Sequence, residues 1–146
     1  LQALGADVVV VDGPDLAAEA RELLGGARPK LGLNAVGGAS ATRVAGLLAP
    51  GGELVTYGAM SKEAVKVPNG FLIFRDIRFR GFWLTRWLRE VSPPAQAEMF
   101  DRIFELARSG CFRPQVAAEF PLRQAAEAVA LAAGPVRGKV VLRLGE

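Results

Sequence analysis

The chain has 146 residues, of which 51% are apolar and 23% charged, so it is long enough for one domain with a substantial core. The net charge of +3 is scattered and accompanies no nucleic-acid-binding motif, and no apolar run approaches the ~20 residues of a membrane span, so we expect neither nucleic acid nor a membrane as partner. The chain has no histidine and only one cysteine, Cys111, which excludes a disulfide within it and a multi-cysteine zinc site, so we predict no metal site.

Strands and helices are predicted to alternate over the first half of the chain. Gly5 is typical of a helix end, and the β-branched run at residues 7–11 predicts a strand buried on both faces. Asp15 is a candidate cap for a helix that runs to Leu24. The next elements are a strand at 31–36, a short helix from Ser40 or Ala41 to Leu48, and a strand at 53–57. This alternation is typical of an α/β fold with a doubly wound parallel sheet.

A strand of a different kind is predicted at residues 77–82, after a loop at 58–69 and one helical turn at 70–74. Its apolar and basic residues alternate, so one face is expected to be exposed, as at the edge of a sheet. Arg78 and Arg80 are most simply interpreted as protection of that edge, and a dimer contact is the alternative.

The sequence changes character between residues 85 and 92. Ser92, Pro93 and Pro94 predict the start of a helix that Gly110 ends. An extended segment at 114–120, an alanine-rich helix at 122–133 and a strand at 138–144 follow. Cys111 is expected to be an inert thiol.

Each of the strands at 31–36, 53–57 and 77–82 ends in a polar, glycine-containing or aromatic cluster. Parallel strands bring their carboxyl ends to one edge of the sheet, where open α/β sheets bind ligands. The clusters expected to meet in one crevice are Asn34, Gly37 and Gly38; Tyr57, Gly58, Ala59 and Met60; and Phe82, Trp83 and Leu84. The chain has no GxGxxG turn, which would hold a pyrophosphate at a helix N-terminus. The residues alone therefore predict an α/β fragment with a crevice at its strand ends.

Five segments resemble the medium-chain dehydrogenase/reductase superfamily, and within it the 2-enoyl thioester reductases. They cover most of the chain in the family's order: LQALGADVVV, LGLNAVGG, LLAPGGELVTYGAMS, LIFRDIRFRGFWLTRW and FPLRQAAEAVALAAGPVRGKVVL. The part LIFRDIRFRGFWL is specific to the enoyl reductase branch, whereas the first three segments and the tail are general to the superfamily.

The resemblance implies an α/β fold with a partial Rossmann-type doubly wound parallel sheet, strands three to six, plus the C-terminal return segment of a GroES-like catalytic domain. Residues 1–84 would be the C-terminal half of the dinucleotide-binding domain, and 85–146 the C-terminal segment of the catalytic domain. In the strand order 3-2-1-4-5-6, the strand at 7–11 has no partner in this chain and the strand at 31–36 leaves an apolar edge unpaired. We therefore expect the isolated chain to be inactive, poorly soluble or locally rearranged.

The resemblance also implies site residues. The loop beside the nicotinamide and its ribose would be formed by Tyr57, Gly58, Ala59 and Met60, where Ala59 replaces a glycine common in relatives. Phe82, Trp83 and Leu84 would contact the nicotinamide and line the acyl pocket, and Lys139 would lie near the cofactor. Asn34, Val36 and Gly37 lie where the superfamily approaches the cofactor. No catalytic residue is expected in this chain, because the family's proton-donating tyrosine lies upstream and Tyr57 does not match it.

Simpler interpretations of the same residues stay open. Gly37 and Gly38 suit an ordinary turn between a strand and a helix, and Tyr57 suits a core position. Phe82 and Trp83 suit a dimer contact or the core. Lys139 at the start of a strand suits plain exposure to solvent.

The implied activity is NADPH-dependent reduction of a trans-2-enoyl thioester of CoA or acyl-carrier protein in fatty acid synthesis, with hydride added at C3 and a proton at C2. A quinone reductase of the same superfamily and a non-catalytic binding module are the alternatives. A homodimer through residues 77–82 is expected. The composition favours bacterial cytoplasm, and the mitochondrial matrix is expected if the source is eukaryotic.

Overall fold

The computed structural model describes residues 1–111 and 114–145. The chain divides into two compact units, Leu1–Glu90 and Val91–Glu146, which are described separately. The assignment of residues 1–84 to a dinucleotide-binding domain and of 85–146 to a catalytic domain stays a prediction.

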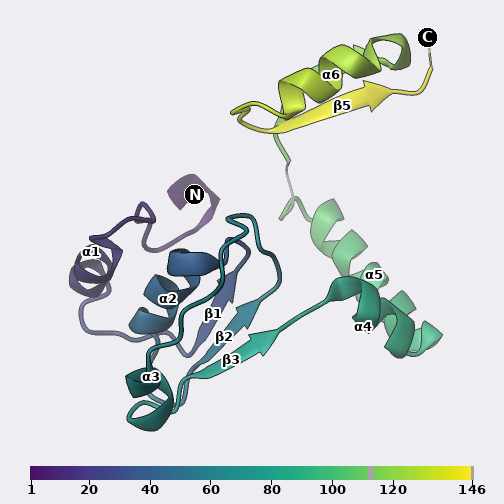
Figure 1. Ribbon diagram of the computed structural model, residues 1–146. Coiled ribbons are helices and arrows are strands. Elements are labelled where there is room, and N and C mark those ends of the chain that lie inside the picture. The colour runs from purple at the N-terminus through teal and green to yellow at the C-terminus, as the bar shows by residue number, and fades with distance from the viewer. Residues whose placement is uncertain (112–113, 146) are drawn as a thin grey trace. The chain divides into compact units, whose positions relative to one another are not determined.

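A three-stranded parallel sheet forms the centre of the first unit (Figure 1). Its strands are β1 (Leu31–Asn34), β2 (Glu53–Thr56) and β3 (Arg78–Gly81), in the order β1-β2-β3. Asn34 pairs with Thr56, and Thr56 pairs with Gly81, so the three strands end level with one another. The predicted strands and their parallel direction are therefore confirmed.

The helices of this unit are short. They are η1 (Gln2–Leu4), α1 (Leu16–Leu23), α2 (Gly38–Leu47), α3 (Asn69–Ile73) and α4 (Leu84–Glu90). Gly5 ends η1 in the left-handed conformation, as predicted. α4 was not predicted, because the aromatic residues before it indicated only the end of a strand.

The core of the first unit lies between α2 and one face of the sheet. Its buried residues are Ala41, Ala45, Leu48, Leu54 and Ile77, and Val44, Val65, Phe71 and Phe79 pack against them. Gly32 in β1 faces this core, and a Cβ there would lie 2.9 Å from Leu54 Cδ1 and 3.0 Å from Val44 Cγ1. Gly32 therefore lets α2 approach the sheet closely.

The opposite face of β1 is open in this unit. Leu31 and Leu33 alternate with the buried Gly32 and Asn34, and Leu33 is 63% exposed. Parallel sheets normally have both faces covered. β1 is also an outer strand of the described sheet, which agrees with the expectation that the strand at 31–36 leaves an apolar edge unpaired.

The prediction of a buried strand at residues 7–11 is wrong. The segment joins no ladder of the described sheets, and Val11 is 84% exposed. A strand needs a neighbour to satisfy its backbone N–H and C=O groups. Its lack of a partner agrees with the strand order expected from the family resemblance.

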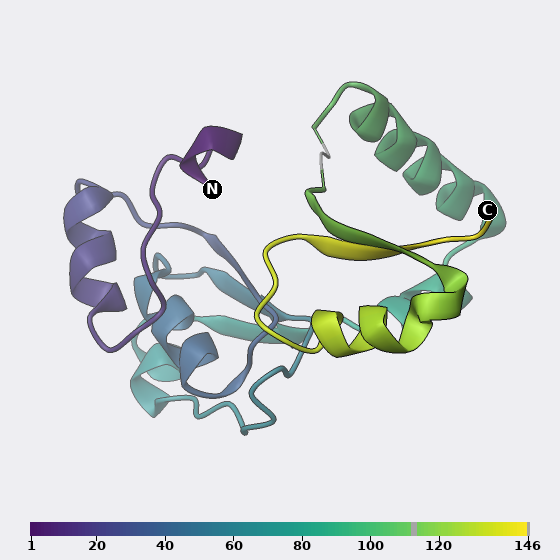
Figure 2. The same cartoon turned by 90° about the horizontal axis from the view of Figure 1, so that it is seen from above.

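The second unit contains α5 (Pro93–Arg108), β4 (Val116–Pro121), η2 (Leu122–Gln124), α6 (Ala125–Ala132) and β5 (Lys139–Arg143). β4 and β5 pair in parallel, with an irregularity between Val116 and Ala118. Figure 2 shows β4 in green beside β5 in yellow, with α6 packed along the pair. The predicted helices and strands of this half are confirmed, but their pairing was not predicted.

None of the helices in the described part of the chain is both long and apolar enough to cross a membrane.

Candidate functional site

The carboxyl ends of β1, β2 and β3 form the candidate site. Asn34 ends β1, and its side chain is 4% exposed. Its Oδ1 accepts a hydrogen bond from the Gly37 N–H at 2.7 Å, and its Nδ2 donates to Ser40 Oγ at 3.1 Å. These two bonds fold the turn between β1 and α2. Gly37 and Gly38 have φ values of 81° and 52°, which glycine adopts most readily.

The loop after β2 lies directly against that turn. The Tyr57 N–H donates to the Asn34 carbonyl at 3.0 Å, the Met60 N–H to the Ala35 carbonyl at 3.1 Å, and the Ser61 N–H to the Val36 carbonyl at 2.9 Å. The β1–β2 ladder thus continues beyond both strands as contacts between loops, and the first two predicted clusters lie together.

Gly58 makes this close approach possible. A Cβ at Gly58 would lie 2.6 Å from the Ala35 carbonyl oxygen and 3.2 Å from Ala35 Cα. Both are backbone atoms that no side-chain rotation can move, so only glycine fits here without a shift of the loop. Ala59 follows Gly58 directly and lies close to the turn after β1. A Cβ added at Gly37 would lie 3.6 Å from the Cα atom of Ala59, which is an ordinary van der Waals distance.

The third cluster begins next to the loop after β2. The Phe82 N–H donates to the carbonyl of Thr56, the residue before Tyr57, at 2.9 Å. The chain then enters α4 at Leu84, and the Trp87 N–H donates to the Trp83 carbonyl at 3.0 Å. Large apolar and aromatic side chains are exposed along this edge, namely Tyr57, Met60, Phe82, Trp83 and Leu84.

The two exposed clusters of this edge are apolar, whereas the Glu63 carboxylate lies over Gly38 of the first cluster. Trp83 is 64% exposed, and neither Tyr57–Met60 nor Phe82–Leu84 contains a titratable side chain other than Tyr57. Such a surface suits binding and the exclusion of water more than proton transfer. Lys139, the remaining predicted site residue, starts β5 in the second unit, where its N–H donates to the Gln115 carbonyl at 2.7 Å and its side chain is exposed. The predicted roles of these residues in cofactor binding stay predictions.

Sequence reasoning missed the internal use of Asn34 and the fold-back of the loop beyond Met60. Ser61 and Glu63 lie over Gly38, where a Cβ would be 3.1 Å from Ser61 Oγ and 2.7 Å from Glu63 Oε2. The available signal was an asparagine at the end of an apolar strand, six residues before a serine on the following helix.

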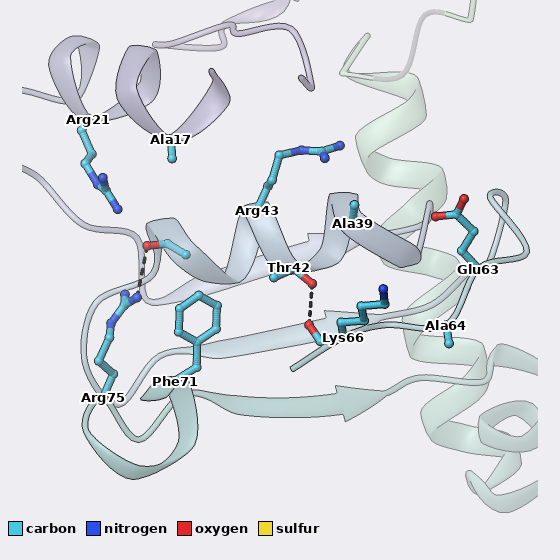
Figure 3. Close-up of a pocket in the computed structure, with 11 residues that line it drawn as sticks. Ala17, Arg21, Ala39, Thr42, Arg43, Glu63, Ala64, Lys66, Phe71 and Arg75 are labelled. Carbon is cyan, nitrogen blue, oxygen red and sulfur yellow. Dashed lines mark hydrogen bonds between the residues drawn. The ribbon is translucent and has the colours of Figure 1, made fainter. Parts of the chain in front are cut away.

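A separate groove of about 760 Å³ lies on the outer face of α2 (Figure 3). Its lining includes Ala39, Thr42 and Gly46 of α2, together with four cationic side chains and one carboxylate, namely Arg21, Arg43, Lys66, Arg75 and Glu63. Two of the cations are already engaged. The Arg75 guanidinium donates to the carbonyls of Gly46 and Leu48, and Arg43 pairs with Asp12, so the groove by itself identifies no ligand.

Asp12 and Arg43 form the ion pair beside this groove, with 2.7 Å between Arg43 Nε and Asp12 Oδ1. The hydrogen bond from Arg43, with a further one from Ser40, holds the pKa of the Asp12 carboxyl below its ordinary value.

Three comparisons relate the chain to known proteins. The family model described as zinc-binding dehydrogenase matches residues 4–142. The mitochondrial enoyl-[acyl-carrier-protein] reductase of Dictyostelium discoideum is 44% identical over 114 residues, which are 77% of this chain and 33% of that protein. The chain thus spans about a third of that curated relative's length.

Two solved structures share the fold. A protein from Bacillus thuringiensis described as an NADPH:quinone reductase has a TM-score of 0.74 at 25% identity, over 86% of this chain and 38% of its own. The mitochondrial 2-enoyl thioester reductase heterodimer of Candida tropicalis has a TM-score of 0.71 at 24% identity, over 88% of this chain and 37% of its own. These likenesses confirm the predicted fold class.

The family's description raises the question of zinc, which protein sites bind through cysteine, histidine and carboxylate ligands. The described residues contain no group of three such side chains, and Cys111 is exposed. The donor set of the described residues therefore does not fit a zinc site. Since the family model covers nearly the whole sequence and the fold agrees with it, the chain belongs to the zinc-binding dehydrogenase family, within the medium-chain dehydrogenase/reductase superfamily.

Proposed function

We propose that this chain forms part of a longer NADPH-dependent reductase that acts on trans-2-enoyl thioesters of CoA or acyl-carrier protein in fatty acid synthesis. The observation that carries the proposal is the joining of the loops after β1, β2 and β3 at the carboxyl edge of a parallel sheet, where open α/β sheets bind ligands. The 44% identity to an enoyl-[acyl-carrier-protein] reductase supports this substrate class.

The residues at the strand ends fit the nicotinamide half of the cofactor. Tyr57–Met60 would hold the nicotinamide and its ribose, because Gly58 keeps this loop tight against Ala35. The exposed aromatic side chains of Phe82 and Trp83 would cover the ring and, with Leu84, exclude water from the acyl pocket. The family resemblance adds Lys139, at the start of β5 in the second unit, as a further cofactor contact in the full-length protein. NADPH, when bound, supplies the hydride for C3. The proton for C2 would come from a tyrosine outside this chain.

The test is an assay of the full-length protein from the reading frame that contains this chain. We expect oxidation of NADPH with crotonyl-CoA, and a large loss of this activity in Trp83→Ala. Trp87→Phe, a change one helical turn further into α4, is the matched control and should retain activity.

The main alternative is a quinone reductase, which the structural likeness to the Bacillus protein favours. Oxidation of NADPH with quinones but not with crotonyl-CoA would replace our proposal with this alternative. If the full-length protein binds no nicotinamide nucleotide, a non-catalytic binding module is the remaining interpretation.

We also propose a homodimer through the edge strand at 77–82. β3 has one partner strand in the described sheet, and the N–H groups of Arg78 and Phe82 bond to β2, so those of Phe79 and Gly81 point outward. Gly81→Pro would remove one outward donor, whereas Gly81→Ala has open space for its methyl group. We expect the proline variant to be monomeric in light scattering and the alanine variant to be dimeric. A dimeric proline variant would exclude this interface.

Two further expectations follow from the same proposal. The 146-residue chain alone should not reduce crotonyl-CoA, because it contains no GxGxxG turn for the pyrophosphate. The cellular location is the bacterial cytoplasm or, as the name of the Dictyostelium relative favours, the mitochondrion.

A further inference from the structure

Asn34 and Ser40 are the two buried polar residues among those that the structure describes, at 4% and 5% exposure. Ser40 also bonds to the Asp12 carboxylate, and both buried residues are closed to solvent, so the hydrogen bonds of both side chains must be formed within the protein. They lie at the start of the candidate site and bond to each other.

Asn34 connects three elements at once. Its Oδ1 accepts from the Gly37 N–H, and its Nδ2 donates to Ser40 Oγ on α2. Its main-chain carbonyl accepts from the Tyr57 N–H of the loop after β2. The residue therefore links β1, the first turn of α2 and the loop that carries Tyr57–Met60.

An amide is the side chain that these contacts require. One end must accept from a main-chain N–H, and the other must donate to a hydroxyl. Aspartate lacks the donor and would bring a charge into a buried position. Alanine would leave the Gly37 N–H without its acceptor and Ser40 with Asp12 as its remaining side-chain partner.

We infer that Asn34 is a positioning residue, oriented by Ser40, that fixes the Gly37 turn and through it the placement of the loop Tyr57–Met60. It acts through that loop, because its side chain is buried and both ends of its amide are bonded to protein groups. The loop's role beside the nicotinamide rests on the proposed function, whereas its placement by Asn34 does not.

Residue-resolved amide hydrogen exchange of the nucleotide-free protein tests the inference. We expect Ser40→Ala to speed exchange at Gly37 and Tyr57 about threefold to tenfold, as loss of one hydrogen bond predicts, and Asn34→Ala to speed it further. The Glu53 and Arg78 amides, which bond to Lys30 and Gly52 at the far ends of the same strands, should keep their rates.

Thr42→Ala is the matched control, because it also removes a hydroxyl from α2. Thr42 Oγ1 donates to the Lys66 carbonyl at 2.6 Å, away from the turn. This variant should leave Gly37 and Tyr57 unchanged. If Ser40→Ala changes neither amide, or changes Glu53 and Arg78 equally, Asn34 and Ser40 serve overall stability only and the inference is wrong.

Nucleotide binding to the full-length protein gives an independent result. We expect Ser40→Ala to weaken NADPH binding in parallel with its effect on exchange, although Ser40 is buried at 5% exposure. If Asn34→Ala weakens binding while Ser40→Ala alters neither binding nor exchange, Asn34 acts by direct contact and the inference is wrong. If exchange changes as expected but no variant or parent binds NADPH, Asn34 still positions the loop and only the proposed function fails.

Discussion

Both units of the chain are built on parallel strands, but they differ in how these strands are covered. In Leu1–Glu90, α2 covers one face of the sheet and buries Leu48, Leu54 and Ile77 almost completely. In the described part of Val91–Glu146, the buried apolar residue is Ala128, while Val116, Val129 and Val141 are exposed. Backbone pairing alone stabilises a two-stranded sheet only marginally. We therefore expect the second unit to be the less stable one.

Leu54→Ala should lower the free energy of unfolding most, because it leaves a cavity in the core under the central strand of the covered sheet. Leu54 is fully buried between β1, β3 and α2, and truncation of such a leucine costs about 2–5 kcal/mol. Urea unfolding followed by tryptophan fluorescence measures this loss, since both Trp83 and Trp87 belong to the first unit. Leu33→Ala, on the open face of β1, should lower the free energy of unfolding far less than Leu54→Ala. If both variants lose the same free energy, this face is covered in solution.

Gly138→Ala should disrupt the second unit selectively. Gly138 has a φ of 121°, and a Cβ there would lie 2.6 Å from the Gln115 carbonyl oxygen. The β4–β5 pairing must shift to admit it, at a cost of about 1–3 kcal/mol. We expect fast exchange at the Lys139 amide and an unchanged tryptophan unfolding curve. A change in that curve would mean that the two units unfold together.

Gly58→Ala tests the first unit at its strand ends. The methyl group would press on the Ala35 backbone, so the loop should move at a cost of about 1–3 kcal/mol. Nucleotide binding by the full-length protein should be lost while the fold is retained by circular dichroism. Gly13→Ala, where a Cβ meets nothing within 4 Å, is the control that should bind normally.

Acidic pH should have the smallest effect. The pKa of Asp12 is lowered by Arg43, so the ion pair contributes its stability above the ordinary aspartate pKa of 3.8 and loses it as the pH falls through the lower folded value. The pair is partly exposed, so solvent screens it and the loss is small. The Asp12→Asn variant should not show this small loss of stability at acidic pH. At other pH values its acid-unfolding curve should have the same shape as that of the parent chain.

The sequence predicts the elements of this chain better than their contacts. The periodicity of residues 31–57 and 93–144 locates strands and helices closely, because amphipathic patterns are local. The segment at 7–11 failed because a strand also requires a neighbour, which no local pattern reports. α4 was missed since the cluster Phe82–Leu84 resembles a strand end as much as a helix start.

For the candidate site, too, the placement of the elements was predictable and the contacts between them were not. The convergence of the three strand ends was predictable, because parallel strands end at the same edge. The contact of Gly58 with Ala35 and the bonds of Asn34 to Gly37 and Ser40 were not, since they depend on how closely particular atoms approach in the folded turn and loop, which no sequence pattern reports.

The exposed thiol of Cys111 makes the chain suitable for distance measurement without any added labelling site. It is the single cysteine and belongs to Val91–Glu146, whereas both tryptophans belong to Leu1–Glu90. A dye attached to this thiol would accept energy from Trp83 and Trp87, so the efficiency of transfer would report the separation of the two units in solution.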